Sequence, residues 1–379
     1  MSSSSLKSQE FPEIQTDLTY FRGRVALAAI LEAVGVRAGD QVALQAFTCI
    51  AVPEAILACR ALPVYVDTEP NGCNMDEKSL AAVLVHKPTI KAVIVQHTFG
   101  LPARIRQLKE VADARGIPVI EDCAHTIASS VDGRPVGTWG VAGFFSHEAS
   151  KPLFTGLGGS IASADPEMLR KLREARSRFT PPGRLLQAQI DAMRLAGEIL
   201  YRPSTYWAVR SLYRSLVKLR ILKGNYNELE AEFEPSAEFG REMGKRQRRI
   251  LEREIRALPR QTAHRERVAE GYRAGISNPR IRHPSIAPGV RAVFGRYPLY
   301  VQEKKRMVEA AMEARIELAD FYATPVHPLK GADLDKVAYV PGSCPNAEQA
   351  MRTVVSLPTG ARVSEKSVAH AVEFFNRWQ

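Results

Sequence analysis

Three polar residues stand at positions from which they could hold and activate one ligand. Lys151 precedes the glycine-rich turn 155–159, and Ser146 lies five residues before Lys151. Asp122 directly follows the strand-like segment 118–121. A lysine amine can bind an aldehyde, a carboxylate can keep a pyridine nitrogen protonated, and a hydroxyl can hold a phosphate. Together these groups predict an enzyme that uses pyridoxal phosphate (PLP).

Each of these residues also has an ordinary structural explanation. Most lysines are solvated, and a carboxylate at a strand end often caps the next helix. Lys151 differs from an ordinary surface lysine in its sequence surroundings. An apolar strand pattern precedes it, and the glycines after it let the backbone approach a ligand or a neighbouring subunit closely. His125 could hydrogen-bond the phenolic oxygen of the ring. Gly23 and Arg24, at a predicted helix start, offer a second phosphate site through backbone N–H groups.

The elements that must position these residues alternate along the first 165 residues. Alternation of β-branched runs and amphipathic helical patterns is typical of a mostly parallel sheet with helices on both faces. Ligands gather at the carboxyl ends of such strands, which is where Asp122, Ser146 and His97 fall. The predicted strands are 41–45, 62–67, 92–96, 118–121, 143–146 and 160–163, and the predicted helices are 24–34, 52–61, 77–84 and 104–115.

The pattern changes after residue 180. We interpret 181–238 as a basic, helical insertion, with apolar residues at helical spacing over 185–222. Its helices could pack on the body or on a second subunit. Alternatively, the basic part 185–223 could make weak contact with a membrane surface or a protein partner.

The C-terminal part mixes helices with short strands. We predict a large PLP-binding domain over 1–240, which includes the insertion, and a small domain over 241–379. The small domain begins with a long helix over 241–276, in which Pro259 predicts a break or kink. A strand is predicted over 296–302, and helices are predicted over 304–314 and 365–378.

Composition restricts the class of protein. The 379 residues are 45% hydrophobic and 25% charged, as expected of a globular chain with more than one core. The sequence contains no apolar run of roughly 18 residues and no signal-peptide core, so we expect a cytoplasmic protein. Five cysteines without a CxxC pair argue against a disulfide scaffold and a metal site. The net charge of +11 favours anionic partners. Nucleic acid is not predicted as a partner, because no nucleic-acid-binding motif accompanies the charge.

Short segments along most of the chain resemble, in the same order, those of the DegT-type (StrS-type) sugar aminotransferases, which are fold-type I PLP enzymes. The resemblance is carried by 23–27, 39–48, 63–67, 74–76, 97–100, 121–122 and 146–151, by Met243, Gln247, Leu258, Arg265 and Tyr272, and by 344–348 and 356–358.

This resemblance implies an α/β, aspartate-aminotransferase-like fold. A large domain with a mainly parallel, seven-stranded sheet would be joined to a small C-terminal α+β domain. The family resemblance also implies a homodimer with active sites at the subunit interface. The expected reaction moves an amino group from L-glutamate, or from glutamine, to a keto-sugar, which we expect to be nucleotide-linked, in glycan or secondary-metabolite biosynthesis.

The resemblance also implies residue roles. Lys151 would bind the cofactor as a Schiff base and then move protons as base and acid. Asp122 would pair with the pyridine nitrogen, and Ser146 would bind the phosphate. His125 would occupy the position beside the ring that is often glutamine or histidine. Gly23, Arg24, Thr48 and Cys49 match further cofactor-binding positions, and His327 and His97 are expected near the substrate.

Some residues depart from the family pattern. Arg24 replaces a common threonine, and Leu157 replaces a glutamate. Cys49 replaces an aromatic residue that commonly stacks on the ring, so we expect stacking from His97 or Phe99. The asparagine that would reach the partner subunit's cofactor is missing from 240–242, and the Asn-Tyr pair at 225–226 is a candidate substitute.

The sequence leaves two alternative functions open. A PLP-dependent sugar dehydratase would resemble this chain but would carry histidine in place of Lys151, so Lys151 favours transamination. A non-catalytic member of the fold could bind a membrane or a protein through its basic helices. The trio of Lys151, Asp122 and Ser146 speaks against that alternative, because a binding module has no use for it.

Overall fold

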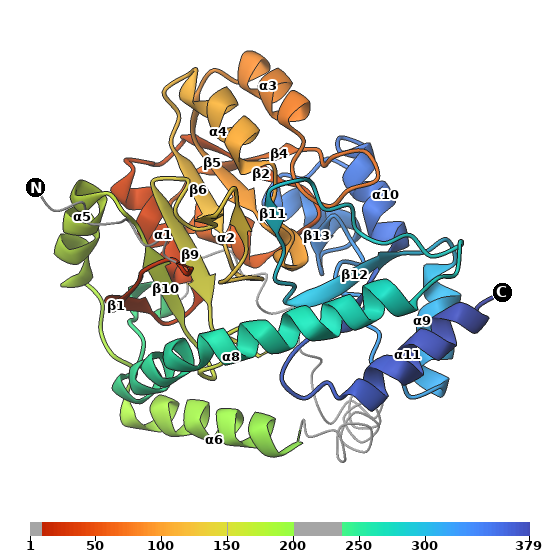
Figure 1. Cartoon of the computed structure of the whole chain (residues 1–379). Coiled ribbons are helices and arrows are strands. Elements are labelled where there is room, and N and C mark those ends of the chain that lie inside the picture. The colour runs from red at the N-terminus through yellow and green to blue at the C-terminus, as the bar shows by residue number, and fades with distance from the viewer. Residues whose placement is uncertain (1–9, 150, 201–236) are drawn as a thin grey trace, which may run out of the picture.

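A seven-stranded sheet forms the centre of the chain (Figure 1). The computed structural model describes residues 10–149, 151–200 and 237–379. The strand order is β1-β10-β9-β6-β5-β2-β4. The strands from β9 to β4 run parallel, whereas β10 is antiparallel to both of its neighbours. These strands are β1 (Ile14–Tyr20), β2 (Gln41–Gln45), β4 (Leu62–Val66), β5 (Ile90–Gln96), β6 (Val119–Asp122), β9 (Ala142–Ser146) and β10 (Gly159–Ala162).

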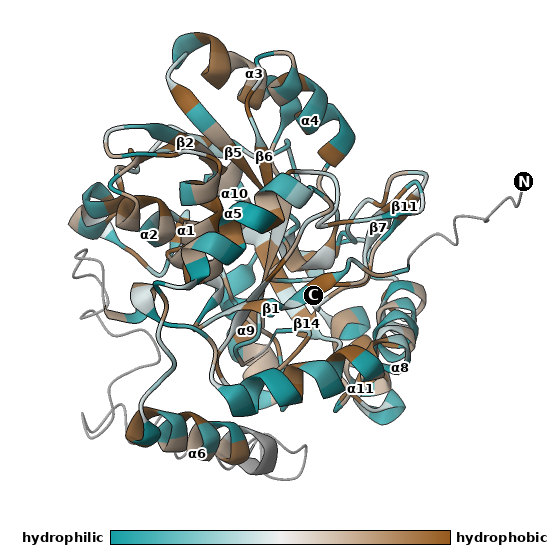
Figure 2. Cartoon of the chain, turned by 90° about the vertical axis from the view of Figure 1, so that its left-hand side faces the viewer, coloured by the Kyte–Doolittle hydropathy of each residue, from teal (hydrophilic) through white to brown (hydrophobic). Residues whose placement is uncertain are grey.

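Helices cover both faces of this sheet, as predicted. Side chains alternate along a strand, so Val42 and Leu44 of β2 pack with α1 and α2, while Ala43 packs with α3 and α4 on the other face. Apolar strands therefore lie between half-polar helices (Figure 2). The helices of this part are α1 (Gly23–Ala33), α2 (Ala51–Ala58), α3 (Glu77–His86), α4 (Ile105–Asp113) and α5 (Pro166–Arg176).

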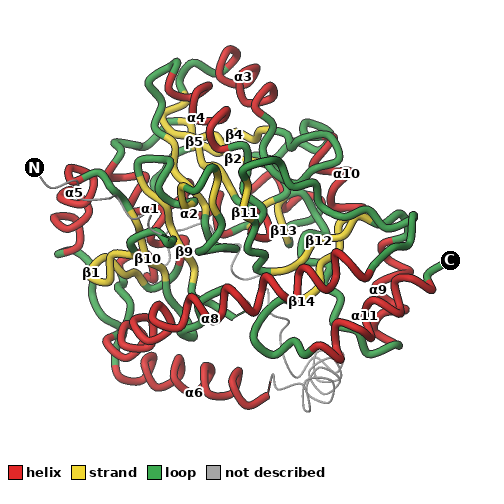
Figure 3. Tube along the Cα trace, in the orientation of Figure 1, coloured by secondary structure: helices red, strands yellow, loops and turns green. Residues whose placement is uncertain are grey.

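A second core forms in the C-terminal part. There β12 and β14 pair antiparallel, and α8, α9 and α11 pack against them (Figure 3). A short parallel pair, β3 with β13, connects this part to the large sheet domain. The elements are β12 (Arg296–Tyr300), β14 (Val354–Pro358), α8 (Lys245–Gly275), α9 (Lys304–Glu313), α10 (Pro345–Thr353), α11 (Glu365–Arg377), β3 (Thr48–Cys49) and β13 (Val326–His327). The remaining short elements are β7 (Ser130–Val131), β8 (Arg134–Pro135), β11 (Val290–Arg291) and the 3₁₀ helices η1 (Thr98–Gly100), η3 (Ala237–Gly240) and η4 (Gly331–Val337).

The long helix α8 differs from its prediction at two points. It begins at Lys245 instead of residue 241, because Gly240 and Glu242 make backbone hydrogen bonds with Thr180 and hold that stretch extended. The predicted break at Pro259 is wrong, since the helix continues through it. Pro259 is exposed, and the buried neighbours Leu258 and Thr262 anchor the helix on its other side.

Only the first part of the predicted helical insertion can be compared with the structure. Helix α6 (Arg184–Leu200) lies along α8, where Gln187 donates to Gln247 at 3.0 Å and Arg246 pairs with Asp191. Residues 201–236, which include the basic half of the stretch and the Asn-Tyr pair at 225–226, lie outside the described residues. No helix in the described part of the chain is both long enough and apolar enough to span a membrane. The domain boundaries remain predictions.

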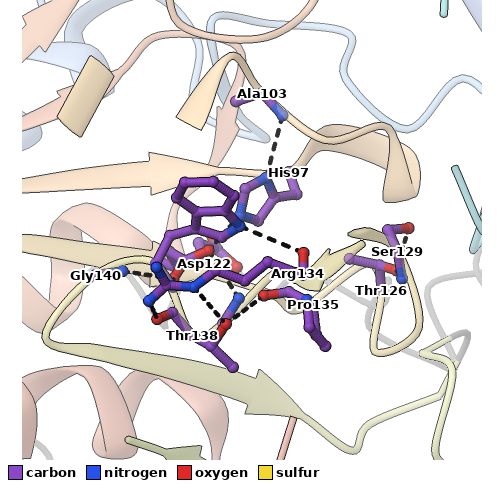
Figure 4. Close-up of polar contacts among 12 residues, drawn as sticks. His97, Ala103, Asp122, Thr126, Ser129, Arg134, Pro135, Thr138 and Gly140 are labelled. Carbon is purple, nitrogen blue, oxygen red and sulfur yellow. Dashed lines mark hydrogen bonds and ion pairs between the residues drawn. The ribbon is translucent and has the colours of Figure 1, made fainter. Parts of the chain in front are cut away.

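A buried carboxylate at the end of β6 holds the loop that follows β8. Glu121 is completely buried and accepts N–H groups from Gly137 at 2.7 Å, Trp139 at 2.6 Å and Gly140 at 2.8 Å. Figure 4 shows Gly140 beside the end of β6. Three charge-assisted hydrogen bonds compensate the desolvation of this carboxylate and fix the path of the chain beside Asp122.

We therefore expect Glu121→Ala to destabilise the fold strongly. Removing the carboxylate leaves three buried N–H groups without a hydrogen-bond acceptor and creates a cavity. Both effects should lower the free energy of unfolding, together by about 3 kcal/mol or more. Urea unfolding measures this loss. Glu110→Gln, at an exposed position of α4, is the control and should change the same free energy by less than about 0.5 kcal/mol. Equal effects of the two substitutions would contradict this account of Glu121.

Candidate active site

A small cavity at the carboxyl edge of the sheet brings Lys151 and His125 together. Its wall combines residues of the large sheet domain with residues from and around β12, which are separated by more than a hundred positions in the sequence. Parallel strands direct their carboxyl ends to this edge. The cavity is lined by Phe99, His125, Lys151, Gly295, Arg296 and Phe321.

Asp122 is a buried carboxylate with an oxygen to spare. Its Oδ1 accepts the N–H of Ala124 at 2.9 Å. Among the described residues, no hydrogen bond to Oδ2 is found. Burial raises the pKa of Asp122 above its ordinary value, while the Ala124 N–H and the charge of Lys151 act in the opposite direction. The site therefore contains a desolvated carboxylate that a cationic N–H donor would stabilise.

His125 presents an N–H group toward its surroundings. The Phe99 N–H donates to Nδ1 at 3.1 Å, so Nδ1 is the acceptor and Nε2 carries the proton. Nε2 lies 3.4 Å from the Tyr322 hydroxyl. Burial, together with the nearby charge of Lys151, holds the pKa of His125 well below its ordinary value. The imidazole is consequently neutral and can donate one hydrogen bond to an oxygen in the cavity.

The predicted phosphate residues Ser146 and Gly23 lie together. A Cβ on Gly23 would come within 3.0 Å of the Ser146 Cβ, so only glycine lets the first residue of α1 approach the end of β9 this closely. The N–H groups of a helix start attract anions, and a hydroxyl adds a further donor. Arg24, the next residue, is held in ion pairs with Glu54 and Glu238.

The structure places Thr48, Cys49 and His327 on one short parallel pair of strands. Thr48 is buried and its hydroxyl donates to Gln96 at 2.7 Å. Cys49 lies opposite His327 in the β3–β13 register. Burial raises the pKa of the Cys49 thiol and lowers the pKa of His327 to about 4, so both side chains are neutral at pH 7. Their roles toward a ligand remain predictions.

Of the predicted site residues, Lys151 and His125 line the cavity and His97 does not. His97 is completely buried, its Nδ1 accepts the Ala103 N–H (Figure 4), and its Nε2 lies 3.1 Å from Glu121. His97, Glu121 and Cys123 bring potential metal ligands within 4.8 Å of one another. The imidazole nitrogens and the Glu121 oxygens already have protein partners, so this cluster is better explained as a structural network.

The glycine-rich turn after Lys151 approaches its own chain. A Cβ on Gly158 would lie 2.4 Å from the Met243 methyl carbon, and one on Gly159 would lie 2.3 Å from the Arg22 carbonyl oxygen. The glycines therefore allow β10 to pack against the start of α1 and the segment before α8. This close approach explains the glycines without a ligand at those positions.

Sequence reasoning did not identify part of the cavity wall. Arg296 begins a predicted strand, but no motif distinguishes its guanidinium, which donates to Glu317 at 2.9 Å and to Ser356. Phe321 lies 5.5 Å from that guanidinium, and Tyr322 packs against Phe99. Arg296 and Phe321 reach the cavity only through the packing of the C-terminal part on the sheet domain, which local sequence patterns do not encode.

Comparison with known proteins identifies the family that this site belongs to. A model of the DegT/DnrJ/EryC1/StrS aminotransferase family matches residues 10–187 and 232–376. The unmatched residues between these two ranges fall inside the predicted insertion.

Two similar proteins carry the names of aminotransferases. A UDP-N-acetyl-3-dehydro-alpha-D-glucosamine 3-aminotransferase of Acidithiobacillus ferrooxidans is 26% identical over 94% of this chain and 82% of its own length. An L-glutamine:2-deoxy-scyllo-inosose aminotransferase of Streptomyces kanamyceticus is 38% identical over 155 residues, which are 41% of this chain and 36% of that relative. The chain thus matches little more than a third of the length of the latter relative.

Solved structures share the fold. DesV of S. venezuelae superposes with a TM-score of 0.73 at 23% identity, covering 95% of this chain and 84% of DesV. The aminotransferase TlmJ of Streptoalloteichus hindustanus gives a TM-score of 0.70 at 25% identity, with 94% and 84% coverage. The predicted aspartate-aminotransferase-like fold is confirmed.

Asp122→Asn should stabilise the protein prepared without cofactor. Because the folded-state pKa of Asp122 is raised, its ionised form destabilises the fold. That penalty is present above the folded-state pKa and vanishes below the ordinary value of 3.8. At pH 8 the free energy of unfolding should rise by about 1 kcal/mol or more. The gain should shrink as the pH approaches 4.

Urea unfolding at several pH values measures this difference. Asp113→Asn, at an exposed position of α4, is the matched control and should show no gain at pH 8. A loss of stability in Asp122→Asn that is the same at pH 8 and pH 4 would show that Asp122 is an ordinary structural carboxylate.

Proposed function

Because the chain belongs to the DegT/DnrJ/EryC1/StrS aminotransferase family, we propose that it is a PLP-dependent aminotransferase that acts on a keto-sugar. The observation that carries this proposal is the arrangement around the cavity. Lys151 and neutral His125 line it, and buried Asp122 feels the charge of Lys151. An amine, a carboxylate and a neutral N–H donor at one edge of the sheet suit the chemistry of PLP.

The residues present fit the cofactor. Asp122 Oδ2 can accept the pyridinium N–H. This donor would give the buried carboxylate a positively charged hydrogen-bonding partner. Gly23 and Ser146 offer backbone and hydroxyl donors to the phosphate. Among the described residues, Lys151 Nζ makes no hydrogen bond or ion pair, so the amine is available to bind the aldehyde. When bound, PLP withdraws electrons from the carbon that carries the amino group.

The chain's own groups would then bind the substrate and move protons. Lys151 Nζ would accept and return a proton during the reaction, because it is the amine that lines the cavity. His125 would donate its Nε2–H to an oxygen of the ring or of the substrate. Asp122 would keep the pyridine nitrogen protonated throughout the reaction. The aromatic walls Phe99 and Phe321 would exclude water from the reacting atoms.

The substrates follow from the relatives. Relatives act on a UDP-linked 3-keto sugar and on cyclic keto-inositols. We therefore expect a keto-sugar or a related cyclic ketone as amino acceptor, and L-glutamine or L-glutamate as donor. The dehydratase alternative remains disfavoured because Lys151 is present where such enzymes have histidine.

We further propose that the protein is a cytoplasmic homodimer. The five cysteines are free thiols, which suits a reducing compartment. Helix α6 exposes the apolar side chains Leu185, Met193 and Leu195, which a second subunit could cover. Light scattering of the purified protein should give twice the chain mass of 41.9 kDa. A mass of one chain would contradict the dimer.

The visible absorption spectrum tests the proposed activity. We expect the protein with PLP to show the absorption band of lysine-bound cofactor, and L-glutamine or L-glutamate to convert it to the spectrum of the aminated cofactor. Lys151→Ala should lose the lysine-bound band and more than roughly 10³-fold of the transamination rate. Lys78→Ala, at an exposed position of α3, should leave both unchanged.

The outcomes separate the alternatives. A donor-dependent spectral change followed by its reversal with a keto-sugar supports transamination. A lysine-bound band that no amino donor alters would favour another PLP reaction. If the wild-type protein shows no band with added PLP, the aminotransferase proposal is wrong and the non-catalytic alternative becomes the better one.

A further inference from the structure

Two arginines flank the glycine at the start of α1. Arg22 and Arg24 stand on either side of Gly23, and three glutamates surround them. Arg22 pairs with Glu148 at 3.4 Å and with Glu238 at 3.1 Å. Arg24 pairs closely with Glu54 and lies 3.7 Å from Glu238.

This cluster borders the proposed cofactor site. Gly23 contacts Ser146, the predicted phosphate residue. Arg22 pairs with Glu148, whose carbonyl accepts the backbone N–H of Lys151 at 3.2 Å. The two arginines therefore flank the residue that contacts Ser146, and Arg22 is linked to the segment that carries Lys151.

Glu238 occupies a distinctive place in the cluster, because its two oxygens reach different arginines. Oε2 lies near Arg22 and Oε1 lies near Arg24. A carboxylate between two guanidinium groups has the charge and shape of an anionic ligand held by an arginine pair. Glu238 comes from the short η3 segment, whereas Glu54 is fixed in α2 with 8% of its side chain exposed.

The charge balance leaves no room for a further anion beside Glu238. Two guanidinium groups and three carboxylates already give the cluster one net negative charge. A phosphate monoester brings about −1.5 to −2 at pH 7. Bound next to all three carboxylates in a partly buried site, it would meet repulsion, because both guanidinium groups of the described cluster are already paired with carboxylates. If one carboxylate moves away, the arginines become available to the phosphate.

We infer that Arg24, supported by Arg22, completes the phosphate site of the cofactor, and that Glu238 holds these arginines until the phosphate replaces it. This inference rests on the proposed function for the identity of the ligand. The ligand chemistry is a phosphate monoester, held by guanidinium groups together with Ser146 and the start of α1. The Glu238 ion pairs thereby compete with cofactor binding.

The test compares PLP with pyridoxal, which has the same aldehyde and ring but lacks the phosphate. Equilibrium binding of each is followed by absorption, which requires no turnover. Arg24→Gln should weaken PLP binding by roughly 10- to 100-fold, because a charge-assisted contact to phosphate is lost. Pyridoxal binding should be unchanged. Arg24→Lys, which keeps the charge but not the planar fork, should fall between Arg24→Gln and the wild type.

Glu238→Gln should act in the opposite direction. Neutralising the competing carboxylate should tighten PLP binding by about fivefold, without affecting pyridoxal. Glu32→Gln is the matched control, because Glu32 lies at the other end of α1 in an exposed ion pair with Arg178. It should leave both affinities unchanged.

Comparing PLP with pyridoxal shows which part of the inference fails. Equal weakening of PLP and pyridoxal by Arg24→Gln would overturn the phosphate role and leave Arg24 a structural residue. Unchanged or weaker PLP binding in Glu238→Gln would overturn the competition. If Arg24→Gln does not fold, Arg24→Lys and Glu238→Gln test the same inference. The quantity compared is again the affinity for PLP relative to the affinity for pyridoxal. A wild-type protein that binds neither compound refutes the proposed function itself.

Discussion

Two adjacent buried carboxylates on β6 organise this site. Glu121 and Asp122 point to opposite sides of the strand, as successive residues must. Glu121 is saturated by three backbone N–H groups and His97, so it serves the fold. Asp122 receives one N–H and retains an oxygen for another donor. The same residue type therefore acts structurally at one position and is available for chemistry at the next.

The placement of Asp122 also explains how stability and function oppose each other here. Burying a carboxylate with incomplete hydrogen bonding is unfavourable, and the raised pKa of Asp122 expresses that penalty. Lys151 offsets part of it through its charge. A protonated pyridine nitrogen would offset more, so the binding of the proposed cofactor and the stability of the fold are thermodynamically linked.

The sequence predicted the sheet domain well and the cavity wall only in part. The strand and helix patterns over the first 165 residues match β2, β4, β5, β6, β9 and β10 and the helices between them, because period-2 and period-3.6 patterns reflect burial directly. His97 was expected near the substrate because it ends a strand, but its neighbour Glu121 draws it into the protein interior. Arg296 and Phe321 depend on packing between distant segments, and the Glu238 ion pairs depend on where η3 lies. Neither kind of contact leaves a local pattern.

The β3–β13 pair shows why the cavity needs both parts of the chain. Thr48 and Ile50 donate backbone hydrogen bonds to Pro325 and His327, which places the segment 321–327 against the sheet domain. That segment contributes Phe321 to the cavity wall and brings Tyr322 against His125. Phe321 and Tyr322 therefore cover the edge of the sheet at which Lys151 and His125 lie. Aromatic walls exclude water, and low-dielectric surroundings strengthen the electrostatic interactions on which proton transfer depends.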